Sequence, residues 1–191
     1  KSGDWNGIGK WYMGREIARV MGYQGMSWLD RPEREQEERT SLLLKNMEIE
    51  EDDTIADIGA GSGYHVFKMA AQAEKGLVYA VDIQEEMLAE INRKIEDDGV
   101  TNVRPVKGSE KSVTLPENSV DKVLIVDVYH EINFPKELMA SLYDAMRANA
   151  KLYLIEYRAE DATVPIKEIH KMSENQAVKE MKAAGFRLQE N

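Results

Sequence analysis

Short apolar runs alternate with longer amphipathic stretches along most of the chain. The apolar runs are residues 54–58, 76–82, 103–107, 122–127, 152–157 and 186–189, and a proline in the third run favours a sheet edge. Helical periodicity marks the stretches between them, at residues 64–75, 84–98, 135–148 and 173–185. Apolar runs this short, bounded by turn residues, are typical of parallel strands with helices on both faces.

This order of elements predicts an α/β fold with a Rossmann-like, doubly wound, mostly parallel sheet. The alternating elements occupy residues 40–191, which we interpret as one domain. Residues 1–39 form an N-terminal extension. We expect one helix within it, at 14–20, and a second helix at 30–46 that continues into the domain. The second of these would begin at Asp30 as a capping acid. The first 28 residues are rich in aromatic side chains, methionine and glycine.

Three glycines at alternating positions follow the first apolar run. Gly59, Gly61 and Gly63, with Ala60 between the first two, let the backbone approach a ligand closely. The helix that follows directs its free N–H groups at this turn, where an anionic group would be stabilised. Asp57 would repel a pyrophosphate there and attract an ammonium or a sulfonium. A tight strand-to-helix turn without a ligand is the alternative.

Composition excludes several classes of function. A formal net charge of −10 argues against a nucleic-acid partner, because binding to phosphates depends on Lys and Arg. No apolar run approaches the length that spans a bilayer, so we expect no membrane partner and a cytoplasmic protein. The absence of cysteine excludes disulfides and thiolate metal sites. The three histidines, His65, His130 and His170, are scattered, so no metal site is expected.

The turn at residues 57–63 resembles motif I of the class I S-adenosylmethionine-dependent methyltransferases. The resemblance implies S-adenosylmethionine as cofactor and S-adenosylhomocysteine as product, with Asp57 near the ammonium group. Asp82 ends the second run, where a carboxylate can accept hydrogen bonds from both ribose hydroxyls, although a dinucleotide fold would use it equally well. Ile83 would pack on the adenine. In the family an acid in the loop at Ser109 and Glu110 binds the adenine amino group, and an exposed loop glutamate is the alternative.

The fourth run ends in a group of polar residues. Ligands of open α/β sheets bind outside the carboxyl ends of the strands, near the switch in strand order. Asp127 lies there and is assigned to the cofactor site. Tyr129 and His130 are candidate catalytic residues that would position the methyl acceptor or remove its proton. The alternative for His130 is a loop or helix-cap histidine.

The resemblance implies an enzyme that transfers a methyl group to a small-molecule acceptor by in-line displacement. Its catalysis would rest on alignment of the two reactants and exclusion of water. Two other functions fit the same motifs. One is a non-catalytic sensor or assembly subunit that binds S-adenosylmethionine or S-adenosylhomocysteine, and the other is a nicotinamide-dependent reductase.

The N-terminal extension is a candidate cover for the active site. We expect Trp11 and Tyr12 near the methionine end of the cofactor or near the acceptor, with Arg15 holding an anionic group. The alternative is an arm packed on the far side of the sheet. The family sheet usually ends in two antiparallel strands, and only residues 186–189 match one of them. We therefore expect either that the natural protein continues beyond Asn191 or that another chain pairs with this strand.

Overall fold

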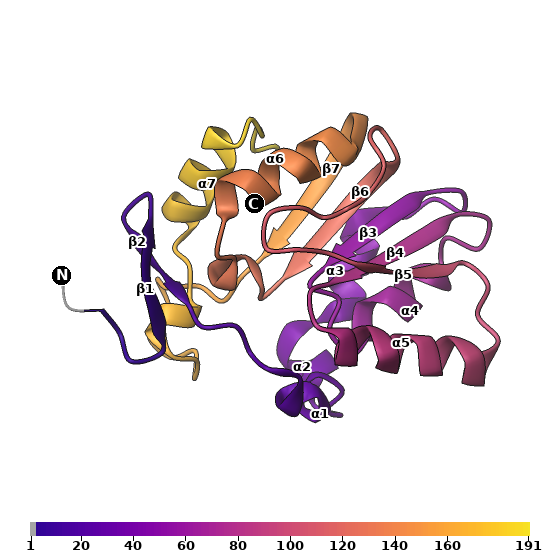
Figure 1. Ribbon diagram of the computed structural model, residues 1–191, viewed down its shortest axis with the longest axis horizontal. Helices are drawn as coiled ribbons and strands as arrows, with labels where there is room; N and C mark the ends of the chain where they lie inside the picture. Colours follow the sequence, from indigo (N-terminus) through magenta and orange to yellow (C-terminus); the bar gives the residue numbers. More distant parts are fainter. Residues whose placement is uncertain (1–2) are drawn as a thin grey trace.

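The computed structural model describes residues 3–191. In this part of the chain five strands form one sheet, in the order β5-β4-β3-β6-β7, and every neighbouring pair is parallel (Figure 1). The strands are β1 Gly7–Tyr12, β2 Arg15–Ala18, β3 Thr54–Ile58, β4 Leu77–Asp82, β5 Val103–Lys107, β6 Val120–Val126 and β7 Met146–Ile155. The α-helices are α1 Met26–Leu29, α2 Arg34–Glu38, α3 Thr40–Met47, α4 Tyr64–Ala70, α5 Glu85–Asp98, α6 Pro135–Ala145 and α7 Glu174–Ala183. The 3-10 helices are η1 Tyr23–Gly25, η2 Tyr129–Glu131 and η3 Glu168–His170.

The strand order confirms the predicted α/β fold. Within the five-stranded sheet, the first strand along the chain is β3, in the centre. Strands β4 and β5 follow on one side of it, and β6 and β7 then follow on the other side. The switch in direction therefore lies between β3 and β6, where doubly wound sheets bind their ligands. Because the strands are parallel, their carboxyl ends meet at one edge of the sheet.

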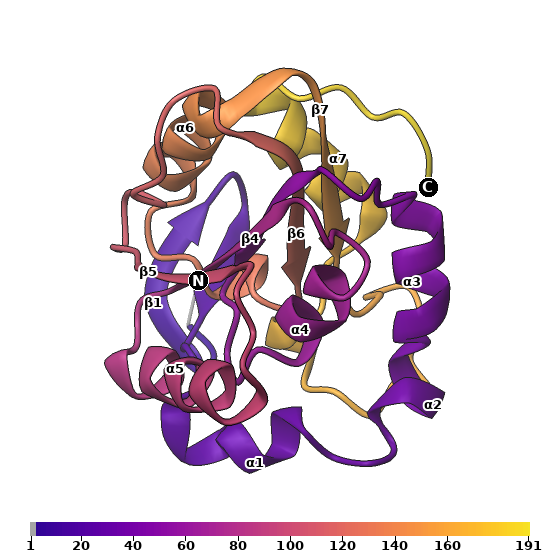
Figure 2. The same ribbon diagram turned by 90° about the vertical axis from the view of Figure 1, so that its right-hand side faces the viewer.

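Two hydrophobic cores cover the two faces of the sheet. Side chains of α6 pack on one face, and side chains of α3, α4 and α5 pack on the other (Figure 1, Figure 2). Strand β6 shows the alternation directly: Val123 and Ile125 belong to the first core, and Leu124 belongs to the second. A strand buried on both faces reads as a continuous apolar run, which is why the sequence predicts it well.

The expected helix at residues 14–20 is wrong. These residues belong to an antiparallel hairpin of β1 and β2, which lies apart from the main sheet in Figure 1. Tyr12 pairs with Arg15, so the loop has two residues, Met13 and Gly14, with φ of 48° and 106°. Two-residue hairpin loops favour positive φ because their twist then matches the strands.

The single helix expected at residues 30–46 is also wrong. Helices α2 and α3 are separated by Arg39, which has a left-handed φ of 51°. Asp30 is not the N-cap of a helix: Glu33 occupies the N-cap position of α2, and Asp30 is the C-cap residue of α1. Its carboxylate accepts hydrogen bonds from Ser62 Oγ at 2.8 Å and from Lys94 Nζ at 3.0 Å, which ties this segment to the glycine turn.

Residues 186–189 form no strand. The ring of Phe186 instead packs edge-on against Tyr143 of α6, with 5.4 Å between the ring centroids. The expectation that the natural protein continues beyond Asn191, or that another chain pairs with this segment, stays a prediction.

Two smaller features of the sheet were also expected from the sequence. Strand β5 is at the sheet edge, where Pro105 is tolerated. Asn149 has the expected left-handed φ of 69°, but it lies within β7, where the register with β6 shifts, because this strand begins at Met146 and not at residue 152. In the described residues no helix is long and apolar enough to cross a membrane.

Candidate functional site

A cavity of about 580 Å³ lies at the carboxyl ends of β3, β4 and β6. Of the predicted cofactor residues, all except Gly63 line it: Asp57, Gly59, Ala60, Gly61, Asp82, Ile83, Ser109, Glu110 and Asp127. Among the candidate acceptor and catalytic residues, His130 lines it, whereas Trp11, Tyr12, Arg15 and Tyr129 do not. The fold thus brings segments far apart in sequence to one space.

The glycine turn is held by strand β4 and by its own conformation. Gly59 N–H and Ala60 N–H donate to Val81 O at 2.8 and 3.1 Å. Gly59, Gly61 and Gly63 have φ of 75°, 55° and 85°, a region that side chains rarely adopt. A Cβ on Gly63 would lie 2.7 Å from the Phe67 ring, so this third glycine serves the packing of α4.

Asp57 is the most deeply buried acid of the cavity. Only 2% of its surface is exposed, and burial raises the pKa of its carboxyl to about 7. Its Oδ2 atom is buried and has no hydrogen-bond partner in the described chain. A buried acceptor without a donor is costly unless a ligand supplies one. An ammonium group at this position would satisfy it.

Asp82 supports the glycine turn as well as facing the cavity. Its Oδ2 accepts the N–H of Gly61 at 2.9 Å and its Oδ1 accepts the N–H of Gln84 at 2.8 Å. Burial raises the pKa of this carboxyl more than these two bonds lower it. Each carboxylate oxygen has a second lone pair, which leaves capacity for ribose hydroxyls.

The remaining cofactor candidates surround the same space. Ile83 is 41% exposed and offers an apolar surface beside Asp82. The side chain of Glu110 accepts a hydrogen bond from Asn133 Nδ2 at 2.6 Å, and Ser109 Oγ accepts the N–H of Ser112 at 3.1 Å. These two side chains therefore shape the loop that borders the cavity.

An N-terminal strap, defined here as residues 20–34, forms part of the cavity wall. Its backbone is held at Met21, whose N–H donates to both Glu131 carboxylate oxygens at 3.2 Å and whose carbonyl accepts from Gln84 Nε2 at 3.1 Å. The residues of this strap that line the cavity are Val20, Met21, Trp28, Leu29 and Arg34. The extension does reach the site, but through residues that the sequence analysis did not select.

Arg15 has a structural partner in place of the expected anionic ligand. Its guanidinium donates two 3.0 Å hydrogen bonds to the fully buried carboxylate of Glu180, and one of 2.9 Å to His130 O. Tyr129 is completely buried beside it, with the Arg15 guanidinium carbon 5.5 Å from the ring centroid. Burial raises the pKa of this phenol.

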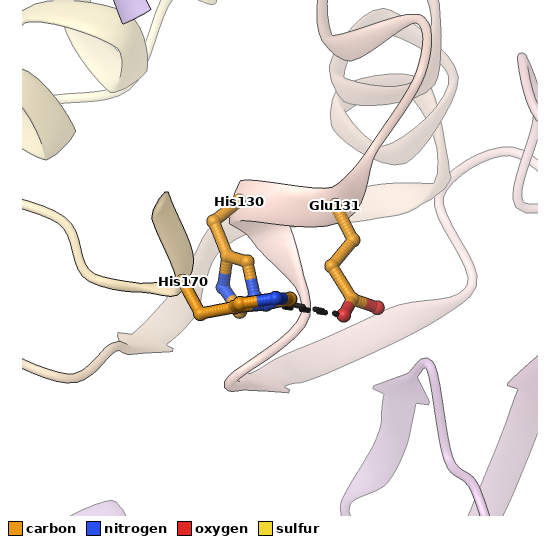
Figure 3. A group of neighbouring side chains, drawn as sticks. All are labelled: His130, Glu131 and His170. Carbon is orange, nitrogen blue, oxygen red and sulfur yellow. Dashed lines mark hydrogen bonds and ion pairs between the residues drawn. The ribbon is translucent and has the colours of Figure 1, made fainter. Parts of the chain in front are cut away.

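Two of the three histidines meet at the cavity, which corrects the expectation that they are scattered (Figure 3). His130 Nε2 lies 3.0 Å from His170 Nδ1, and Glu131 Oε1 lies within 3.7 Å of both nitrogens. On its other side His130 Nδ1 lies 2.7 Å from Glu156 Oε2. Burial lowers the pKa of His130, but the hydrogen bonds that its ring donates to the carboxylates of Glu131 and Glu156 outweigh burial and raise the pKa to about 10.

Sequence reasoning missed Glu156 and His170. Glu156 directly follows β7, and His170 ends η3 on the connection to α7. Only the pairing of β6 with β7 brings Glu156 beside His130, so no local motif marks it.

The fold and the cavity together define a class of protein: a doubly wound α/β enzyme whose glycine turn and strand-end acids surround a nucleoside-sized space. Comparisons with known proteins narrow this class. A family model described as "Methyltransferase domain" matches residues 55–149. The uncharacterized methyltransferase YdaC of Bacillus subtilis (strain 168) is 27% identical over 143 residues, which are 75% of this chain and 76% of that protein.

A protein-L-isoaspartate O-methyltransferase of Methanococcoides burtonii is 35% identical over 97 residues, which are half of this chain and 47% of that protein. Among solved structures, a SAM dependent methyltransferase from Aquifex aeolicus superimposes with a TM-score of 0.84 at 27% identity, covering 90% of this chain and 92% of that one. The chain belongs to the class I S-adenosylmethionine-dependent methyltransferases.

Proposed function

We propose that the protein transfers the methyl group of S-adenosylmethionine to a small-molecule acceptor by in-line displacement. One observation carries the proposal: a single cavity joins the Asp57 and glycine-turn region to the His130 region. Its volume of about 580 Å³ lies within the range of roughly 300 to 1,000 Å³ typical of small-molecule sites. Strap residues also line it, as do Pro165, Ile166, Lys167 and His170, and this lining from several segments favours a compact acceptor over a polymer.

The residues of the cavity fit the cofactor. The unpartnered Asp57 Oδ2 would accept from the ammonium, Asp82 would accept from the ribose hydroxyls, and Ile83 would contact the adenine. Ser109 and Glu110 border the adenine end. When bound, S-adenosylmethionine supplies an electrophilic methyl group on a sulfonium.

In this reaction the protein would align the methyl donor with the acceptor and exclude water from the site. The His130 end of the cavity is where an acceptor would be oriented, because His130 is itself fixed by Glu156 at 2.7 Å. The apolar strap side chains of Val20, Trp28 and Leu29 would exclude water from the space between the two ends. Tyr129 is not part of this proposal, since its ring does not reach the cavity.

Calorimetry with S-adenosylmethionine and S-adenosylhomocysteine tests the cofactor site. We expect one equivalent of each to bind, and Asp82→Ala to weaken binding by ~1.5 to 3 kcal/mol. Binding of a nicotinamide cofactor instead would support the reductase. A panel of small acceptors, assayed by radioactive methyl transfer, then separates an enzyme from a sensor. Tight cofactor binding without transfer to any acceptor class would contradict the proposed activity.

Hydrogen exchange tests the strap as the active-site cover. Added S-adenosylhomocysteine should slow exchange in residues 20–34 and in the glycine turn, because both line the cavity. The hairpin of β1 and β2 is an internal control, since Trp11 and Tyr12 do not line the cavity. If added S-adenosylhomocysteine slowed exchange in the hairpin but left exchange in the strap unchanged, this assignment would be contradicted.

A further inference from the structure

Three potential metal ligands converge at the outer end of the cavity. Figure 3 shows the side chains of His130, Glu131 and His170 pointing toward one another. The distance from His130 Nε2 to His170 Nδ1 is 3.0 Å, and Glu131 Oε1 lies 3.7 Å and 3.6 Å from these two atoms. Ligands about 2.0 to 2.1 Å from one ion are separated by ~3.0 to 3.4 Å, depending on whether the geometry is octahedral or tetrahedral. The triangle of donor atoms therefore has nearly the size of a metal site.

The surrounding groups hold two of these ligands in place. Glu156 Oε2 lies 2.7 Å from His130 Nδ1, so the proton of a neutral His130 is fixed on Nδ1 and the lone pair of Nε2 faces His170. A carboxylate on the far nitrogen of an imidazole is the usual arrangement around metal-bound histidines. Glu131 is held by the Met21 N–H, which donates to both of its oxygens at 3.2 Å.

The carboxylates around His130 and His170 favour binding of a cation. Three carboxylates, from Asp127, Glu131 and Glu156, surround the two imidazoles. Within residues 3–191 these carboxylates form ion pairs with imidazoles alone and with no Lys or Arg: Asp127 and Glu156 pair with His130, and Glu131 pairs with both histidines. Asp127 Oδ1 is also buried without a hydrogen-bond partner there.

We propose that His130, Glu131 and His170 bind a divalent transition-metal ion. Two imidazoles and one carboxylate suit zinc, iron, cobalt and nickel, whereas magnesium and calcium prefer oxygen ligands throughout. All three residues line the cavity, so the remaining coordination positions face the space where an acceptor would lie. Three protein ligands with an open position are typical of a catalytic metal and not of a structural one.

Titration of the tag-free, chelator-treated chain with Zn²⁺ by calorimetry tests the site, and Co²⁺ provides a visible absorption band for the same ligands. We expect one equivalent of either ion. His170→Ala should weaken binding at least ~100-fold, and Glu156→Gln by about 10- to 100-fold, because Glu156 acts through His130. Glu168→Gln is the matched control: this exposed acid lies two residues from His170 and pairs with Lys171. It should leave binding unchanged.

His170 is the variant of choice because its side chain is partly exposed, whereas His130 is buried and its loss could unfold the chain. Urea unfolding of each variant verifies the fold. The proposal would be overturned if neither Zn²⁺ nor Co²⁺ bound stoichiometrically, or if the unchanged chain and His170→Ala bound the metal ion with equal affinity. The titration uses neither cofactor nor acceptor, so its result and the result for methyl transfer are independent.

Discussion

Replacing Asp57 by asparagine should stabilise the ligand-free protein and weaken its binding of S-adenosylmethionine. The carboxyl of Asp57 is buried, and its pKa rises from an ordinary 3.8 to about 7 in the folded chain. Between these two values the folded chain retains a proton that the unfolded chain has released. The free energy of unfolding therefore falls as the pH rises from 3.8 toward 7, and the loss is complete above the folded pKa.

The two pKa values give the size of this effect. Between pH 5 and pH 8, ionisation of Asp57 should lower the free energy of unfolding by ~3 kcal/mol. Asp57→Asn cannot ionise, so its stability relative to the unchanged protein should grow by this amount over the same range. The cost of burying the amide does not depend on pH and cancels from the comparison.

Urea unfolding at pH 5, 6, 7 and 8 measures the difference, with Asp97→Asn, an exposed acid of α5, as the control for loss of one charge. Calorimetry at pH 8 should show cofactor binding weakened about 10- to 150-fold, because the carboxylate no longer accepts from an ammonium. A stability difference that stays constant with pH would refute the buried, ionisable state of Asp57. Unchanged affinity would remove Asp57 from the cofactor site.

Three further predictions separate structural from functional roles. Gly61→Val should lower cofactor affinity at least ~10-fold in calorimetry, since Gly61 has a left-handed φ and a Cβ there would lie 2.7 Å from Leu29 Cδ1. Adding Leu29→Ala to this variant removes the contact and should restore only part of the lost affinity. Full restoration would show that backbone strain at Gly61 is unimportant. Arg15→Ala should lower the free energy of unfolding by ~3 to 5 kcal/mol in urea, because it leaves the buried Glu180 carboxylate unpaired, and a loss of cofactor affinity without a loss of stability would contradict this. Tyr129→Phe should keep the rate of methyl transfer within about twofold, because the ring does not reach the cavity, and a large fall in rate at unchanged stability would restore it as a catalytic candidate.

The sequence predicts the sheet because buried parallel strands carry their own signal. The runs that became β3, β4 and β6 are apolar on both faces, so neither their register nor their neighbours need to be known. The hairpin has no such signal. Its turn is Met13-Gly14, which lacks the asparagine or aspartate typical of two-residue loops, and the short strands around it mix polar and apolar residues without strict alternation.

The same distinction applies to the site. Asp57, Asp82 and the glycines belong to local motifs at strand ends, and the structure places their side chains or backbone at one cavity. Glu156 and His170 both lie on the connection from β7 to α7, far from His130 in sequence, and their meeting with His130 depends on the pairing of β6 with β7 and on the path of η3. Likewise the strap had the composition of a cover, but which of its side chains face the cavity depends on the hairpin that precedes it.

The distribution of unsatisfied polar atoms supports the assignment of the cavity independently of any motif. In residues 3–191 six buried side-chain atoms lack a hydrogen-bond partner, and four of them belong to cavity-lining residues: Asp57, His65, Asp127 and Asn133. Each such atom costs stability in the ligand-free chain, of the order of ~1 to 3 kcal/mol. The unsatisfied polar atoms are concentrated at the cavity, whereas buried polar groups are satisfied almost everywhere else in the described chain. This distribution is typical of a site whose ligands supply the missing donors and charges.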